Sequence, residues 1–159
     1  MSEIISIDFK DKHLPAAKTS LIGKSGEDLA ARFLARHSYR LVLRNFKAPI
    51  GRNNSGVQVS GEIDIVALDG DCLCFVEVKT RSSDDFASPL AAVDLRKQRQ
   101  IIRTARVYRK IFDVKNVRFR YDAVSIVLNG KKAPNLEIFK NFWTEDKFRK
   151  KSWADDFYN

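Results

Sequence analysis

The sequence predicts a mixed α/β fold in which helices flank a central mixed sheet of five strands, in the order α-β-β-β-α-β-β. Two segments with helical spacing of apolar residues occur among five runs rich in β-branched and aromatic residues. The length of 159 residues favours one domain, and a hydrophobic content of 44% is sufficient for a buried core. The same composition excludes a disordered chain, a collagen-like repeat and a disulfide-stabilised scaffold.

The boundaries of the predicted elements follow from local patterns. In chain order, the elements are an N-terminal arm (1–20), a helix (21–37), a strand (39–46), a long loop (47–60), two strands (61–68 and 71–79), a helix that ends near Phe112, two strands (117–128 and 135–142) and a charged C-terminal tail (144–159). The first segment has no sustained period, and the long loop is assigned because it contains Pro, Gly, Asn and Ser. The folded domain is therefore expected to span residues 21–143.

Each predicted helix has a recognisable apolar side. In the first helix, Gly26 and Phe33 lie on one arc at 100° per residue, opposite a charged side. In the second helix, Ser88 is expected to be the N-cap and Pro89 the first helical residue. Lys97 lies in the middle of the apolar stripe of this helix. From there it can extend to solvent along the stripe, or reach an acidic cluster or a phosphate.

A hairpin is predicted between the second and third strands, because Asp69 and Gly70 separate two β-rich runs and favour a type I′ turn. This turn would pair Leu68 with Asp71. Side chains alternate between the two faces of a strand, so one face of the hairpin collects four charged residues at one end: Glu62, Asp64, Glu77 and Lys79. The cysteines Cys72 and Cys74 are expected on the opposite face as small core residues.

Three carboxylates at one end of a half-apolar face repel one another, and a cation relieves this repulsion. Such oxygen-rich sites suit Mg²⁺ or Mn²⁺, which bind one or two carboxylates together with water and substrate phosphate. Lys79 can orient or deprotonate an attacking water, or stabilise a pentavalent phosphate. An ordinary cross-strand ion pair is the alternative explanation for Glu77 and Lys79. Asp64, in a strand expected to be central, requires a partner or a function.

The net charge of +9 is confined to one segment. Residues 96–120 contain ten Lys and Arg and one acid, Asp113, whereas the rest of the chain sums to zero. Half of these cations form one stripe of the second helix: Arg96, Arg99, Arg103, Arg106 and Lys110. The stripe is either a solvated helix face or a surface that follows the phosphates of a nucleic acid. No apolar run is long enough to span a membrane, no signal peptide is visible, and a cytoplasmic location is the default expectation.

Three motifs resemble those of the bacterial YraN-type family of predicted endonucleases. They are residues 23–27 (GKSGE), 61–67 (GEIDIVA) and 75–81 (FVEVKTR), and the resemblance extends over roughly residues 21–143, including Lys97, residues 120–122 (RYD) and residues 141–142 (NF). That family is similar to the archaeal Holliday junction resolvases and belongs to the restriction-endonuclease-like superfamily. The resemblance therefore implies a restriction-endonuclease-like fold.

The resemblance also assigns roles to individual residues. It implies a catalytic set of Glu27, Asp64, Glu77 and Lys79. The metal ligands are expected to be Asp64 and Glu77, with Glu62 as an extra acid, and the substrate-binding residues are expected to be Lys97, Arg81 and Arg120. The long loop and the N-terminal arm depart from the family pattern without removing any of these residues.

The resulting hypothesis is a Mg²⁺- or Mn²⁺-dependent nuclease that hydrolyses phosphodiester bonds of DNA, with branched or single-stranded DNA as candidate substrates. The expected partner is nucleic acid, DNA ahead of RNA, without a membrane, and a homodimer is considered because junction resolvases usually form one. Two alternatives stay open. The first is a non-catalytic nucleic-acid-binding module, and the second is an interaction protein that docks an acidic partner through its basic helix.

Overall fold

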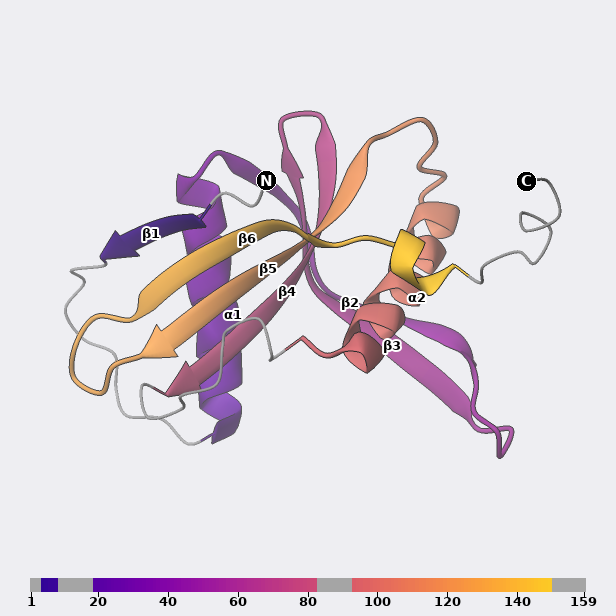
Figure 1. The fold of residues 1–159 in the computed structure, drawn as a ribbon, viewed down its shortest axis with the longest axis horizontal. Helices are drawn as coiled ribbons and strands as arrows, with labels where there is room; N and C mark the ends of the chain where they lie inside the picture. Colours follow the sequence, from indigo (N-terminus) through magenta and orange to yellow (C-terminus); the bar gives the residue numbers. More distant parts are fainter. Residues whose placement is uncertain (1–3, 9–18, 83–92, 150–159) are drawn as a thin grey trace, which may run out of the picture.

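The computed structural model describes residues 4–8, 19–82 and 93–149 as a mixed sheet with one helix on each face (Figure 1). The elements are β1 (Ile4–Asp8), α1 (Thr19–Arg36), β2 (Tyr39–Arg52), β3 (Gln58–Asp69), β4 (Cys72–Ser82), α2 (Leu95–Ile111), β5 (Phe119–Leu128), β6 (Asn135–Trp143) and a 3-10 turn, η2 (Asp146–Phe148). The strand order is β1-β6-β5-β4-β3-β2. The β4–β5 pair is parallel and the other pairs are antiparallel, so the sheet is mixed.

The predicted α/β class and the order α-β-β-β-α-β-β are confirmed for the elements from α1 to β6. The described sheet has six strands where five were predicted, because the segment expected to form an arm contains β1. This strand pairs antiparallel with β6, with Ile4 opposite Phe139 and Asp8 opposite Asn135. Within the described residues, neither helix is long and apolar enough to cross a bilayer.

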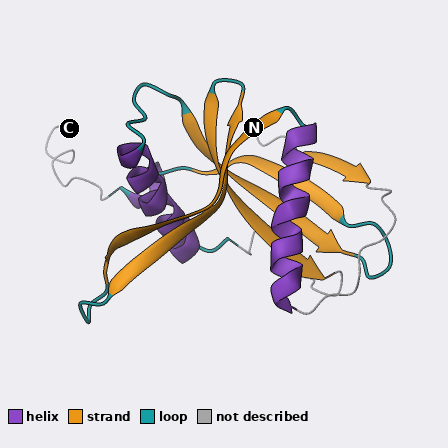
Figure 2. Cartoon of the chain, turned by 180° about the vertical axis from the view of Figure 1, so that it is seen from behind, coloured by secondary structure: helices purple, strands orange, loops and turns teal. Residues whose placement is uncertain are grey.

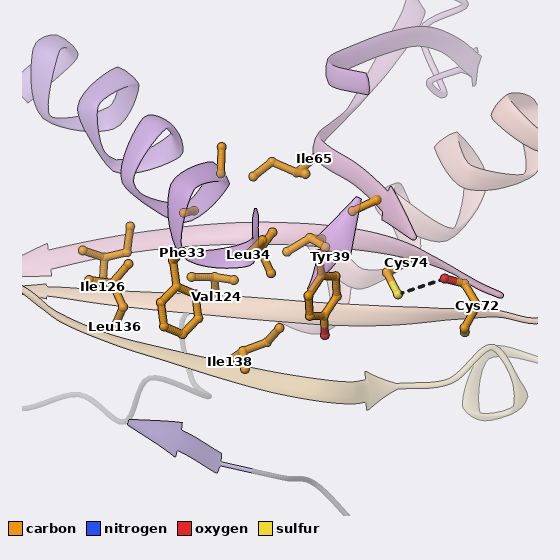
Figure 3. Packing of buried hydrophobic residues seen from close by; sticks show 14 residues of the cluster. Phe33, Leu34, Tyr39, Ile65, Cys72, Cys74, Val124, Ile126, Leu136 and Ile138 are labelled. Carbon is orange, nitrogen blue, oxygen red and sulfur yellow. Dashed lines mark hydrogen bonds between the residues drawn. The ribbon is translucent and has the colours of Figure 1, made fainter. Parts of the chain in front are cut away.

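Two apolar cores lie on opposite faces of the sheet. Figure 3 shows the first core, where α1 contributes Phe33 and Leu34 against sheet residues that include Val124 and Ile138. Cys72 and Cys74 are buried in this core as free thiols, as predicted. The second core joins α2 to the other face of the sheet, and its largest members are Phe75, Tyr108, Tyr121, Phe139 and Trp143. Each fully buried side chain of this size contributes about 1.5–3 kcal/mol, so the sheet is held from both sides.

The prediction of a long loop at residues 47–60 is wrong. β2 continues to Arg52 and β3 begins at Gln58, so most of this segment is a two-stranded ribbon that projects beyond α2 (Figures 1 and 2). Pro49 is compatible with this pairing because β2 is an edge strand, where a missing N–H group removes no obligatory ladder bond. From here on, "the arm" means residues 47–61 and not the N-terminal segment 1–20.

The start of the second helix also differs from the prediction. α2 begins at Leu95, and Asp94 is its N-cap, with Oδ1 accepting a hydrogen bond of 2.8 Å from the backbone N–H of Lys97. The predicted cap at Ser88 and Pro89 lies outside the described residues. The Asp94 carboxylate thus satisfies a free N–H of the first turn, the role that the prediction had given to the serine.

Candidate functional site

The turn between β3 and β4 determines which acidic residues meet. The predicted pairing of Leu68 with Asp71 is wrong, because Leu68 pairs with Leu73. Gly70 has a φ of +60° at the first turn position and Asp71 stays outside the left-handed region, a combination typical of a type II′ turn and not of type I′. The register is shifted by two residues, which leaves every side chain on its predicted face.

The corrected register places Asp64 beside Glu77. The β3–β4 ladder ends at the pair Ile65–Val76, so Asp64 and Glu77 are the next residues on their strands. Beyond this pair, Asp64 Oδ2 accepts a hydrogen bond of 2.7 Å from the backbone N–H of Val78. Both carboxylates are buried, with exposed fractions of 9% for Asp64 and 2% for Glu77.

The environment of Asp64 disfavours its negative charge. Burial raises the pKa of the Asp64 carboxyl to about 7, and repulsion by the Glu77 carboxylate acts in the same direction. The hydrogen bond from Val78 and the charge of Lys97 oppose this increase without cancelling it. A bound cation would remove the repulsion between the two carboxylates.

Two lysines from different elements flank Glu77. Lys79 Nζ lies 2.9 Å from Glu77 Oε1, and Lys97 Nζ, which α2 brings to the sheet, lies 3.4 Å from Glu77 Oε2. Lys97 thus reaches the acidic cluster, one of the two positions expected for it. Glu77 Oε2 is nevertheless without a hydrogen-bond donor among the described residues, although it is buried. A buried carboxylate oxygen of this kind has a free lone pair for a ligand.

The other two predicted acids lie at the margins of this centre. Asn45 Nδ2 donates a hydrogen bond of 2.8 Å to Glu27 Oε2, and the charge of Glu27 adds weakly to the raised pKa of Asp64. Glu62 Oε1 lies 3.5 Å from Lys47 Nζ. No group of three or more His, Cys, Asp or Glu side chains suited to a metal occurs in the described ranges. The structure therefore brings together Asp64 and Glu77, and leaves Glu62 in a separate ion pair.

The position of Glu27 depends on a close contact between α1 and β4. A Cβ atom at Gly26 would overlap with the hydroxyl of Thr80, so the absence of a side chain lets the helix approach the strand. Asn45, which binds Glu27, has a positive φ of +51° in β2. Sequence reasoning missed Asn45, although an asparagine that interrupts an apolar strand pattern could have identified it.

The predicted substrate-binding arginines lie in different environments. Arg81 follows Lys79 by two residues on β4, so strand alternation places both on one face. Arg120 instead donates hydrogen bonds to Asp69 and Asp122, at 2.6 and 2.9 Å. The same guanidinium donates to the hydroxyl of Tyr39 at 2.9 Å. The observed contacts of Arg120 are therefore structural, since Asp122 is completely buried.

Replacing Arg120 by alanine is expected to destabilise the fold by about 3–5 kcal/mol, because it removes the cation that compensates the buried Asp122 carboxylate. Urea denaturation of Arg120→Ala measures this loss, and Arg32→Ala, which removes an exposed arginine of α1, is the matched control. A variant with unchanged stability but weakened nucleic-acid binding would contradict the structural role and restore Arg120 as a substrate contact.

The donor set at Asp64 and Glu77 fits a hard divalent cation. Mg²⁺ is usually bound by one or two carboxylates and completes its coordination with water and phosphate oxygens. Two buried carboxylates, a carboxylate oxygen that has no donor in the described part of the chain and a raised Asp64 pKa agree with this chemistry. Cys72 and Cys74 do not supply sulfur ligands to this site, because they lie in the apolar core on the α1 side.

Fold and site together define a class of mixed α/β domains with a buried pair of carboxylates flanked by two lysines. The model of a family described as "Uncharacterised protein family UPF0102" matches residues 26–126, and the chain belongs to this family. The matched range contains all four residues of the centre: Asp64, Glu77, Lys79 and Lys97. The resemblance inferred from the three sequence motifs is thereby confirmed.

Relatives from several bacteria share most of the chain. A UPF0102 protein of Prosthecochloris aestuarii is 39% identical over 134 residues, which cover 84% of this chain and 94% of the relative. UPF0102 proteins of Paenarthrobacter aurescens (42% identical; 74% and 88% covered) and Chlorobium chlorochromatii (37% identical; 82% and 98% covered) are also similar. The similarity therefore extends over most of the chain and not only over the motifs.

Proposed function

We propose that this protein is a divalent-metal-dependent nuclease that hydrolyses phosphodiester bonds of DNA. The observation that carries the proposal is the buried pair Asp64 and Glu77, in which Glu77 Oε2 has no hydrogen-bond donor within the described residues and two lysines supply positive charge. A purely structural ion pair would not require a second buried carboxylate beside it. A site for Mg²⁺ or Mn²⁺ next to phosphate-binding cations explains the whole set.

The residues have separate roles in this proposal. Asp64 and Glu77 would hold the metal ion, which when bound acts as a Lewis acid and activates water. Lys79 would stabilise the negative charge that develops on the phosphate, since it projects from the same strand face as Glu77. Lys97 would bind a substrate phosphate from the α2 side. Glu27, fixed by Asn45, would assist from α1.

The proposal also covers the nucleic acid that is cleaved, the cellular location and the oligomeric state. DNA is favoured over RNA, and the location is taken to be the cytoplasm. Glu62 is retained as an accessory acid only if its replacement affects cleavage, because its present partner is Lys47. A homodimer would supply two such centres to the two strands of a substrate, and its formation is testable by sizing in solution.

The test is a cleavage assay with Mn²⁺ and labelled single-stranded, duplex and branched DNA, together with RNA. Wild-type protein is expected to cleave at least one DNA substrate, and Glu77→Gln is expected to reduce the rate by at least about 100-fold through loss of a metal ligand. Glu137→Gln is the control, because it removes the same charge from β6 outside the centre.

Two results would count against the proposal. One is no cleavage of any substrate by the folded wild-type protein in the presence of Mn²⁺. The other is cleavage that Glu77→Gln and Glu137→Gln reduce to the same extent. DNA binding that depends on salt and persists in Glu77→Gln, without cleavage by wild type, would instead support the non-catalytic nucleic-acid-binding module. Glu62→Gln, measured in parallel, decides whether Glu62 belongs to the site.

A further inference from the structure

The arm is bound firmly to one side of α2. Gln100 Nε2 donates a hydrogen bond of 3.0 Å to the carbonyl oxygen of Ser60, and Arg103 donates to the carbonyl oxygen of Ile50. A Cβ atom at Gly61 would overlap with the hydroxyl of Thr104, so ribbon and helix are in close contact. The arm and the outer face of α2 therefore form one continuous surface.

The tip of the arm has a preformed conformation. Asn53 Oδ1 accepts hydrogen bonds from the backbone N–H groups of Ser55 (3.0 Å) and Val57 (2.9 Å), which close the turn. Arg52 Nη1 donates to the carbonyl oxygen of Gly56 at 2.7 Å. All residues from 51 to 58 are exposed. A ribbon that is ordered and yet exposed is ready to contact a partner without a large loss of conformational entropy.

This surface is strongly basic. Residues 47–61 include Lys47 and Arg52 and no acid. The outer face of α2, which we call the basic face, is exposed and consists of Arg96, Arg99, Arg103, Arg106 and Lys110. Within the described part of the chain, Arg106 is the member of this face that pairs with a carboxylate, that of Glu145. The remaining charge complements a polyanion.

We propose that the arm enters the major groove of a B-form DNA duplex while the basic face of α2 contacts the adjacent phosphates. A two-stranded β-ribbon fits this groove, which is about 12 Å wide, and Arg, Asn and Gln are the side chains that bind base edges there. The exposed tip offers Arg52, Asn54 and Gln58.

The composition of the arm argues against other nucleic acids. Residues 47–61 contain no aromatic side chain on which unpaired bases could stack, as single-strand binding normally requires. The major groove of A-form RNA is too narrow and deep for side chains to read. The arm thus selects duplex DNA, including the duplex arms of a branched molecule.

The inference deepens the proposed nuclease function, on which it rests for the place of cleavage. β3 runs directly from the arm to Asp64, six residues after Gln58. At about 3.4 Å per residue this is about 20 Å, or roughly six base pairs of B-form DNA. The scissile phosphate is therefore expected roughly six base pairs from the groove contact, and duplexes shorter than this on the arm side should be poor substrates.

Binding is tested without metal, by fluorescence anisotropy of a labelled 30-base-pair DNA duplex in EDTA. The triple variant Arg52→Ala/Asn54→Ala/Gln58→Ala is expected to raise the Kd for the duplex at least tenfold. Arg99→Ala, which removes one cation of the basic face assigned to phosphates, should lower the slope of log Kd against log salt by about one. Unlabelled single-stranded DNA and RNA duplex should compete less well than DNA duplex. A photo-crosslinking residue at position 54 should attach to the DNA duplex.

Lys131→Ala/Lys132→Ala is the control, because it removes two charges from the β5–β6 turn at the opposite end of the molecule (Figure 1). Thermal melting verifies that both variants are folded. The inference is overturned if the triple variant binds within twofold of wild type, if the control loses as much affinity, or if RNA duplex competes equally. Binding through the arm with no cleavage would refute the nuclease alone, whereas cleavage that depends on Glu77 but not on the arm would refute only this inference.

Discussion

Replacing Asp64 by asparagine is expected to reduce metal-dependent cleavage by at least about 100-fold and, at the same time, to stabilise the fold above pH 7. The loss of cleavage follows from the loss of a carboxylate ligand beside Glu77. The gain in stability follows because the asparagine carbonyl can still accept the hydrogen bond from Val78, while the buried negative charge is gone.

The pH dependence of this gain is determined by the raised pKa of Asp64, about 7 in the folded protein as a result of burial and the nearby Glu77 charge. In the unfolded chain an aspartate titrates near pH 4. Between these two values the folded state binds more protons, so the free energy of unfolding of wild type falls as the pH rises. The stability gain of Asp64→Asn over wild type is therefore at most about 4 kcal/mol above pH 7, and it disappears below about pH 4.

Urea denaturation of wild type and Asp64→Asn at pH 4.5 and pH 8, in EDTA, measures this difference. The variant should gain stability over wild type mainly at pH 8. Adding Mg²⁺ at 100 times its Kd should then stabilise wild type by about 2.7 kcal/mol and Asp64→Asn by less. An advantage of equal size at both pH values, or an equal response of the two proteins to the cation, would disprove a charged metal ligand at this position.

Replacing Lys79 by alanine is expected to lower kcat by about 100- to 1,000-fold, as the loss of one group that stabilises transition-state charge does in other enzymes. Lys79 Nζ lies 2.9 Å from the Glu77 carboxylate. The proposed function therefore gives Lys79 an electrostatic role and not that of a base. Lys79→Arg, which keeps the charge but cannot act as a base, should retain more activity than Lys79→Ala.

Lys97→Ala provides the comparison, since Lys97 approaches Glu77 from α2 at 3.4 Å and is assigned to substrate phosphate. Its loss should raise KM more than it lowers kcat, because uniform binding of substrate and transition state affects KM alone. Steady-state kinetics of the three variants, with Lys132→Ala in the exposed β5–β6 turn as a control, separates these effects. If Lys79→Arg is as inactive as Lys79→Ala, Lys79 acts as a base or requires the lysine geometry, and the electrostatic role is wrong.

Most elements and the pairing of functional side chains on one strand could be predicted from the sequence. Glu77 and Lys79 are two residues apart on one strand, so alternation places them on the same face in any register. A register shift of two residues also leaves Asp64 on that face. The register itself could not be predicted from Asp69 and Gly70, because it depends on cross-strand packing. The observed register pairs Leu68 with Leu73, and a Leu–Leu pair buries more apolar surface than the predicted Leu68–Asp71 pair.

The arm shows why local composition misled the prediction. Pro, Gly, Asn and Ser within residues 47–60 are typical of a loop, and they form the turn at its tip. The strands on either side persist because Gln100 and Arg103 bind their carbonyl groups and Ile50 is buried. These contacts come from α2, 40 and 53 residues further along the chain, and no local pattern contains them.

The sequence by itself determined the α/β class, the family, the two core faces and the candidate acids, because periodicity, turn residues and motifs are local properties. Only the tertiary structure decided which charges meet. It brought Lys97 to Glu77, assigned Glu62 to Lys47, and directed Arg120 to Asp69 and Asp122, away from a free surface. The reason is physical: ion pairs between distant residues depend on how helices and strands pack, and that packing is decided by the two cores as a whole.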